Sequence, residues 1–198
     1  MADIRGASQA VVLENSSGDE VGLITRPVWV AQFPGIRYFS ENATSIASAA
    51  GRVASSLFLP AAASVHIFIV GMFAYYDADT ATFRPEFRRV TAASGGTLRS
   101  GVALAKRDTA DANSAAEVRY YTATLAVTEV TDANGGLIST PGPLKIIQGT
   151  SKDDAVSLST HTLESKIRLR PGEGLIYKWV TDPSQNARIN WIWEEFTP

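Results

Sequence analysis

The chain has 198 residues, of which 45% are hydrophobic and 19% are charged, and its formal net charge is −2. This composition can bury a substantial core and argues against disorder along the whole chain. The near balance of charge gives no electrostatic case for tight nucleic-acid binding, which needs a clustered excess of cations. Because the chain has no cysteine, disulfides, zinc–thiolate sites, iron–sulfur clusters and cysteine nucleophiles are also excluded.

The first forty residues are expected to form an extended arm. Three candidate strands in this region are separated by Asn15–Asp19 and by Arg26-Pro27. The opening has no basic segment followed by an apolar one, so we expect no signal peptide. We therefore predict an N-terminal arm over residues 1–40, packing on or exchanging with neighbouring subunits, and a β-sandwich domain over residues 41–198.

The next region contains the one segment where a short helix is expected. Ser40–Ala50 is rich in Ala and Ser, and at most one or two short helices are predicted for the chain. It is followed by Val53–Tyr76, which contains no Asp, Glu, Lys or Arg and is long enough to cross a bilayer. Pro60 and His66 interrupt this segment, so we interpret it as buried β-structure and expect no membrane contact.

The strand expected at Val65–Tyr76 is apolar on both faces. Regular alternation places Phe68 and Met72 on one face and Ile67 and Phe73 on the other. One face of a sandwich strand packs on the core, so the second face must be covered by another part of the chain or by a neighbouring subunit. We favour a subunit, and Phe68 and Met72 become candidate interface residues.

Turn residues recur at short intervals along the rest of the chain. Ser94-Gly95-Gly96 predicts a glycine-rich hairpin, Asn134-Gly135 a type I′ hairpin, and Pro171-Gly172 a type II turn. The runs between such turns are short and rich in Val, Ile, Thr and aromatic residues. This spacing predicts an all-β fold, an antiparallel β-sandwich of jelly-roll type.

The last strands show clear two-residue alternation. One face of Leu163–Arg170 carries the cations Lys166, Arg168 and Arg170, which form either a solvated face or a candidate interface with an acidic partner. In Ala187–Glu194, the apolar face carries Trp191 and Trp193. Two indoles on one strand face either pack in a core or interface, or form a platform that stacks on sugar rings.

Catalytic and metal-binding patterns are absent from the sequence. The two histidines, His66 and His161, form no His-Glu-x-x-His motif. The pair Asp77 and Asp79 lacks the further ligands of a calcium loop. Pro171-Gly-Glu-Gly174 lacks the Lys-Ser or Lys-Thr of a phosphate-binding loop. We therefore expect no catalytic residue, no metal, no cofactor and no enzymatic activity.

Several segments resemble those of small jelly-roll structural proteins in the virions of tailed bacteriophages. They are Gln9-Ala-Val-Val-Leu-Glu-Asn-Ser-Ser-Gly-Asp-Glu20, Arg89-Val-Thr-Ala-Ala-Ser-Gly-Gly-Thr97, the loop Asp108–Ala116 leading into Glu117-Val-Arg-Tyr, and Leu169-Arg-Pro-Gly-Glu-Gly-Leu175. The resemblance implies a head-decoration, head–tail or tail/baseplate accessory protein, located in the virion as a homo-oligomer bound to other virion proteins. The alternative is a carbohydrate- or receptor-binding module that binds a host glycan through Trp191 and Trp193.

Overall fold

The computed structural model describes residues 35–40, 42, 44–140, 143–145, 156–159 and 167–198. These residues form β-strands and one 3₁₀ turn, η1 (Asp132–Asn134), and they contain no α-helix. No helix in this part of the chain could therefore cross a membrane. The expected arm lies outside the described residues as far as Pro34, and so does Lys166.

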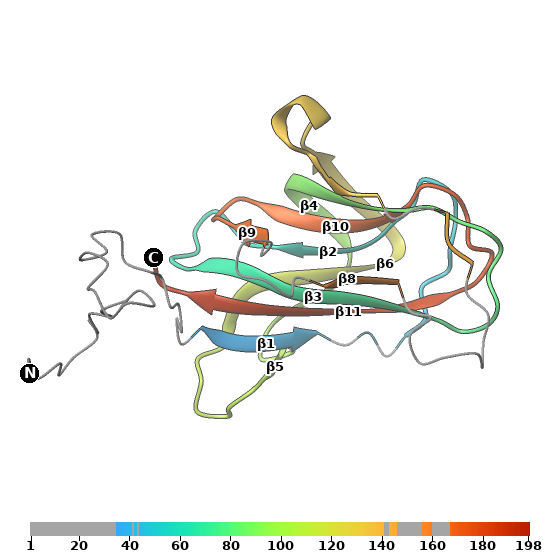
Figure 1. Cartoon of the computed structure of the whole chain (residues 1–198). Helices are drawn as coiled ribbons and strands as arrows, with labels where there is room; N and C mark the ends of the chain where they lie inside the picture. Colours follow the sequence, from blue (N-terminus) through green and yellow to red (C-terminus); the bar gives the residue numbers. More distant parts are fainter. Residues whose placement is uncertain (1–34, 41, 43, 141–142, 146–155, 160–166) are drawn as a thin grey trace, which may run out of the picture. The chain divides into compact units, whose positions relative to one another are not determined.

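The strands form two antiparallel sheets (Figure 1). The six-stranded sheet has the order β5-β1-β11-β3-β8, and β9 also pairs with β3. Its strands are β1 (Ile36–Ser40), β3 (His66–Tyr76), β5 (Ala105–Lys106), β8 (Val156–Ser159), β9 (Ile167–Leu169) and β11 (Ala187–Phe196). The five-stranded sheet has the order β10-β2-β6-β4-β7. Its strands are β2 (Val53–Phe58), β4 (Pro85–Gly101), β6 (Ser114–Glu129), β7 (Leu137–Ser139) and β10 (Gly174–Trp179).

The strands pair in a nested order. The first strand, β1, pairs with the last, β11; β2 pairs with β10; β3 pairs with β8 and β9; and β4 pairs with β6. A long antiparallel hairpin wound into two sheets produces this pattern, which is the topology of a jelly roll. The prediction of an antiparallel, jelly-roll-like β-sandwich is confirmed.

The core lies between the inner faces of the two sheets. In β11, buried and more exposed residues alternate over the whole strand, as the sequence predicts, and in β9 the exposed Arg168 lies between the buried Ile167 and Leu169. The largest fully buried side chains are Trp179, Trp191, Trp193, Tyr38, Tyr120, Tyr177, Phe83 and Phe87. Aromatic side chains therefore provide much of the buried apolar area that stabilises the sandwich.

Two expectations for residues 36–50 are corrected by the structure. The predicted boundary after residue 40 assigned β1 to the arm, but β1 pairs with β11 and β5 and belongs to the sandwich. No helix forms in the described part of Ser40–Ala50. Instead, the buried Ile46 forms a β-bridge with Ala187, with N–O distances of 2.8 and 3.0 Å. This bridge satisfies the backbone of Ile46 and places its side chain in the core, which outweighs a weak helix propensity.

Two of the three predicted turns also differ in the structure. Gly95 and Gly96 lie within β4, where β6 continues alongside, rather than in a hairpin. Both have positive φ, and a Cβ atom would lie 2.6 Å from the carbonyl oxygen of Thr124 at Gly95 and 2.5 Å from that of Tyr120 at Gly96. Glycine is needed here because the two strands bulge and approach each other closely.

Asn134-Gly135 does not form a type I′ hairpin. Asn134 ends the 3₁₀ turn η1, and Gly135 follows with a left-handed φ of 76°. The next strand, β7, pairs with β4 instead of returning along β6. Pro171-Gly172 does form the predicted type II turn, because Gly172 has a φ of 85° and Glu173 N donates to Arg170 O at 2.9 Å.

The five-stranded sheet closes on itself. Strand β10 pairs with both β2 and β4, and β6 also pairs with both β2 and β4. The four strands contribute to a second, smaller core, formed by Val53, Val90 and Ile176 with the partly buried Phe58, Leu125 and Val127. Gly174 lies at the closure, where a Cβ atom would be 2.7 Å from the Phe58 ring, so only glycine fits without rearrangement.

Two buried tyrosine hydroxyls and an indole form hydrogen bonds between the two sheets. Because of these tyrosines, we expect the protein to lose stability in alkali. The hydroxyls of Tyr76 and Tyr177 are 2.7 Å apart, and Trp179 Nε1 donates to Tyr76 at 2.8 Å. Burial raises the pKa of both tyrosines above the usual value of about 10. The unfolded chain therefore loses these protons first, so their contribution is complete below about pH 10 and is lost as the pH rises further.

We expect the free energy of unfolding, measured in urea between about pH 8 and pH 11.5, to fall above about pH 10. In the Tyr177→Phe variant one of the two buried ionisations is removed, so the decline should be shallower. Equal slopes for both proteins would contradict the assignment.

Candidate interaction face

A β-bulge in the middle of β3 decides which of its side chains face the core. Ile69 and Gly71 pair with consecutive residues of β11, so Val70 is skipped in the ladder. An extra residue in one strand reverses the alternation of the residues that follow it. The core-facing positions therefore change from odd to even numbers along the strand, and the buried side chains are Ile67, Ile69, Met72, Ala74 and Tyr76.

The bulge separates the two interface residues that were predicted for this strand. Phe68 lies on the outer face, partly exposed, and its ring stacks on Phe196 with centroids 4.5 Å apart. Met72 lies on the inner face and is 0% exposed. The prediction that Met72 is an interface residue was wrong. It assumed uninterrupted alternation along the strand, which would place Met72 on the same face as Phe68.

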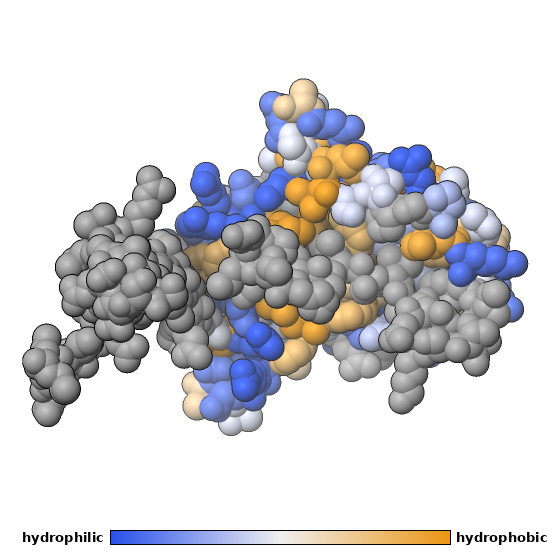
Figure 2. Space-filling view, in the orientation of Figure 1, coloured by the Kyte–Doolittle hydropathy of each residue, from blue (hydrophilic) through white to orange (hydrophobic). Residues whose placement is uncertain are grey.

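The outer face of the six-stranded sheet carries a group of large apolar side chains. We call this group the apolar face; its members are Phe39, Phe68, Phe73, Tyr75, Ile192 and Phe196. Phe39 lies opposite Ile192 in the ladder between β1 and β11. The rings of Phe73 and Tyr75 stack 6.4 Å apart, and Tyr75 is 46% exposed. Figure 2 shows hydrophobic surface in the part of the view where β3 and β11 lie in Figure 1.

Polar groups beside the apolar face are paired. Arg37 Nε donates to Glu194 Oε1 at 3.0 Å across β1 and β11. Arg168 Nε donates to His66 Nδ1 at 3.1 Å, and the same guanidinium lies 5.8 Å from the centroid of the Phe196 ring. Desolvation and the nearby arginine charges lower the pKa of His66, so its ring is held in the neutral form that accepts this hydrogen bond.

The predicted cation strip is only partly within the described residues. Arg168 and Arg170 are exposed at the end of β9, and Lys166 lies outside the described residues. Arg168 contacts His66, and the backbone N–H of Arg170 donates to the Glu173 carboxylate at 2.9 Å. The side chains of Arg168 and Arg170 are thus on the surface, with one acidic group beside them.

The two tryptophans proposed as a glycan platform lie in the core. Trp191 and Trp193 are fully buried, and their indole N–H groups donate to Ser55 Oγ at 2.8 Å and to Glu195 Oε1 at 3.1 Å. Neither ring can stack on a sugar without unfolding the sandwich. The platform interpretation was wrong, because the apolar face of β11 points between the sheets.

Sequence reasoning missed a buried carboxylate that closes the end of the core. Glu195 is buried and accepts hydrogen bonds from Trp193 Nε1, from the Ser114 hydroxyl and from the backbone N–H groups of Ala115 and Ala116. Only the alternation of β11, which puts this glutamate on the same face as the tryptophans, could have indicated it. Within the described residues no group of three or more His, Asp or Glu side chains could hold a metal ion.

No protein-family model matches the chain, and no curated protein or solved structure matches it significantly. Jelly rolls occur in viral capsid domains, in lectins and in cupins, so the fold alone does not select a function. The function of this protein must therefore be inferred from its surface.

Proposed function

We propose that this protein is a structural component of a phage virion that acts through contacts between subunits, as a capsid decoration, connector or tail accessory protein. The observation that supports subunit contact is the apolar face on the outside of the six-stranded sheet. The assignment to a virion is supported by the resemblance of the sequence segments and by a fold that viral capsid domains use. No catalysis is part of this proposal.

The apolar face has the composition of a protein–protein interface. Interfaces bury an apolar, aromatic-rich centre and keep a polar rim around it. Here Phe73, Tyr75 and Ile192 supply apolar side chains, and the paired Arg37 and Glu194 supply part of the rim. Burial of one large apolar side chain contributes about 1.5–3 kcal/mol, so a few such side chains stabilise an association by several kcal/mol. We propose that a second copy of this chain covers the face.

Tyr75→Glu is expected to dissociate the assembly and leave the fold intact. The side chain is the most exposed member of the apolar face, and a carboxylate there would be desolvated by a neighbouring subunit. Size-exclusion chromatography with light scattering should show an oligomer for the wild type and a smaller species for the variant. Circular dichroism should be the same for both.

Leu98→Glu is the matched control. Leu98 is 43% exposed, close to the 46% of Tyr75, but it lies on β4 in the other sheet. This variant should keep the wild-type oligomeric state. A wild-type protein that is monomeric at all concentrations, or equal dissociation by both variants, would contradict the proposal that the apolar face is the subunit contact.

A further inference from the structure

A pocket of about 240 Å³, with both polar and apolar residues in its lining, opens beside the middle of β6. It is lined by the segment after β1 and by parts of β4 and β6, which contribute Asn42, Ser45, Thr97, Arg99, Tyr121 and Thr122 among others. Pockets for drug-sized ligands have about 300–1,000 Å³. This pocket is smaller and suits a ligand built on a single ring.

The strand register directs Arg99 toward this pocket. Thr97 lies opposite Tyr120 and Arg99 lies opposite Val118 in the ladder between β4 and β6. Directly opposed residues project from the same face of a sheet, and both Tyr120 and Val118 are buried in the core. Thr97 and Arg99 therefore lie on the same face of the sheet as these core residues, where Thr97 is exposed and Arg99 is partly buried. In the described residues, β7 and β10 pair with β4 no further than Val90, so β6 is the only neighbour of this part of β4, which forms an edge.

The positive charge at the pocket is not neutralised by the described part of the protein. Arg99 forms no ion pair there, whereas Arg88 and Arg119 on the same sheet pair with carboxylates. A second guanidinium, that of Arg52, lies 4.2 Å from the centroid of the Tyr121 ring and donates to the carbonyl oxygens of Ala47 and Ser48. Arg52 does not itself line the pocket, so Arg99 is the one cation among the lining residues, and the lining Ser45 donates to the Asp77 carboxylate. The guanidinium of Arg99, unpaired within the described residues, favours an anionic ligand.

The rest of the lining is suited to a hydroxyl-rich ligand. The lining residues Thr97, Thr122 and Tyr121 carry hydroxyl groups, and Asn42 carries an amide whose Oδ1 already accepts from Thr44 N at 3.1 Å. Hydroxyl and amide groups exchange hydrogen bonds with sugar hydroxyls. The planar fork of an arginine binds a carboxylate through two parallel hydrogen bonds.

We propose that this pocket binds an acidic sugar, with its carboxylate on Arg99 and its hydroxyls on the threonine and asparagine side chains. None of the residues that line the pocket belongs to the apolar face, and neither tryptophan lines it. It would give a virion component a means of contacting a glycan that ends in a carboxylated sugar.

The test is ligand-observed NMR, with N-acetylneuraminic acid and glucuronic acid as probes and with glucose and N-acetylglucosamine as neutral comparisons. At least one acidic sugar should bind about tenfold or more tightly than the neutral ones, since charge-assisted hydrogen bonds are the stronger ones. Arg99→Gln should weaken that binding by about tenfold or more. Arg107→Gln is the matched control, because Arg107 is exposed, has no ion pair in the described residues and lies outside the pocket.

Three results would overturn the proposal. They are the absence of binding at millimolar sugar, equal binding of neutral and acidic sugars, and equal binding of inorganic sulfate, which would show a general anion site. An inward-pointing cation on an edge strand can also prevent pairing with another chain. If Arg99→Gln aggregates and the wild type binds no acidic sugar, Arg99 serves that protective role instead. If the proposal holds, Arg99→Gln and Arg107→Gln should both keep the wild-type melting temperature and oligomeric state. The sugar-binding result is therefore independent of the subunit-contact proposal.

Discussion

Met72→Asp is expected to unfold the sandwich, whereas Tyr75→Asp is expected to leave it folded. Met72 is 0% exposed, on the inner face of β3, and Tyr75 is 46% exposed on the outer face. Truncation of a buried methionine to alanine alone costs about 2–5 kcal/mol, and a carboxylate without a partner in the core costs more. Since a domain is stable by only about 5–15 kcal/mol, Met72→Asp should have no cooperative unfolding transition in urea.

The two variants together test the β-bulge at Val70. With regular alternation along β3, residues 72 and 75 would still lie on opposite faces, but Met72 would share the outer face with Phe68. A folded Met72→Asp protein with native circular dichroism would show that Met72 faces outward and that the bulge is absent. An unfolded Tyr75→Asp protein would show that Tyr75 is buried, either in the core of a strand with regular alternation or beneath another part of the chain.

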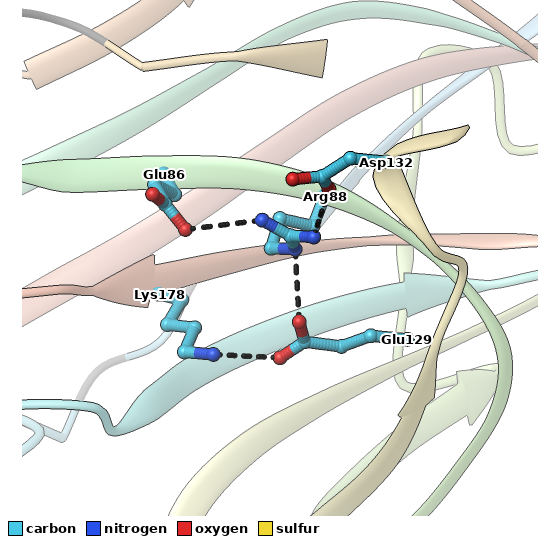
Figure 3. A network of polar contacts seen from close by, with 5 residues as sticks. All are labelled: Glu86, Arg88, Glu129, Asp132 and Lys178. Atoms are coloured by element: carbon cyan, nitrogen blue, oxygen red, sulfur yellow. Dashed lines mark hydrogen bonds and ion pairs between the residues drawn. The ribbon is translucent and has the colours of Figure 1, made fainter. Parts of the chain in front are cut away.

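Arg88→Met is expected to destabilise the domain by about 2–4 kcal/mol, because it leaves partly buried carboxylates without their cation. Figure 3 shows Arg88 at the centre of the network. Its guanidinium is 3.4 Å from Glu86 and 2.8 Å from Glu129, and it also contacts Asp132. Glu129 is shared with Lys178 at 2.7 Å. The network joins η1 to β4, β6 and β10. These three strands also contribute to the second core.

Asp132→Asn is the control for Arg88→Met. The Asp132 side chain is 63% exposed, whereas that of Arg88 is only 14% exposed. Solvent-exposed ion pairs contribute about 0–1 kcal/mol, so this variant should lose less than about 1 kcal/mol of unfolding free energy. Urea unfolding at one pH measures both variants. Equal small losses would show that the network does not stabilise the closure of the five-stranded sheet.

Local patterns in the sequence were sufficient to predict the fold class and several strands. The alternation in β11 and β9 is a property of consecutive residues, and a half-buried strand requires it wherever its partners lie. The turn predicted at Pro171-Gly172 depended equally on local sequence, because proline and glycine set the backbone angles of a type II turn by themselves. The all-β prediction followed from many such segments with turns between them.

Features that depend on pairing between distant segments were decided only by the tertiary structure. Alternation along the sequence assigns Met72 and Phe68 to the same face of the strand. The register of β3 against β11 instead places Met72 inside and Phe68 outside. Ile46 forms a β-bridge with Ala187, so it does not adopt the helix that the weak helix propensity of its segment predicts.

The candidate sites depended on the tertiary structure for the same reason. Trp191 and Trp193 could have faced solvent or core, and the second sheet, by packing over them, buries both. Arg99, Tyr121 and Asn42 meet in one pocket only after the strands are wound into a jelly roll. Alternation defines two faces for a strand, but the neighbouring strands and the opposite sheet determine which face is buried.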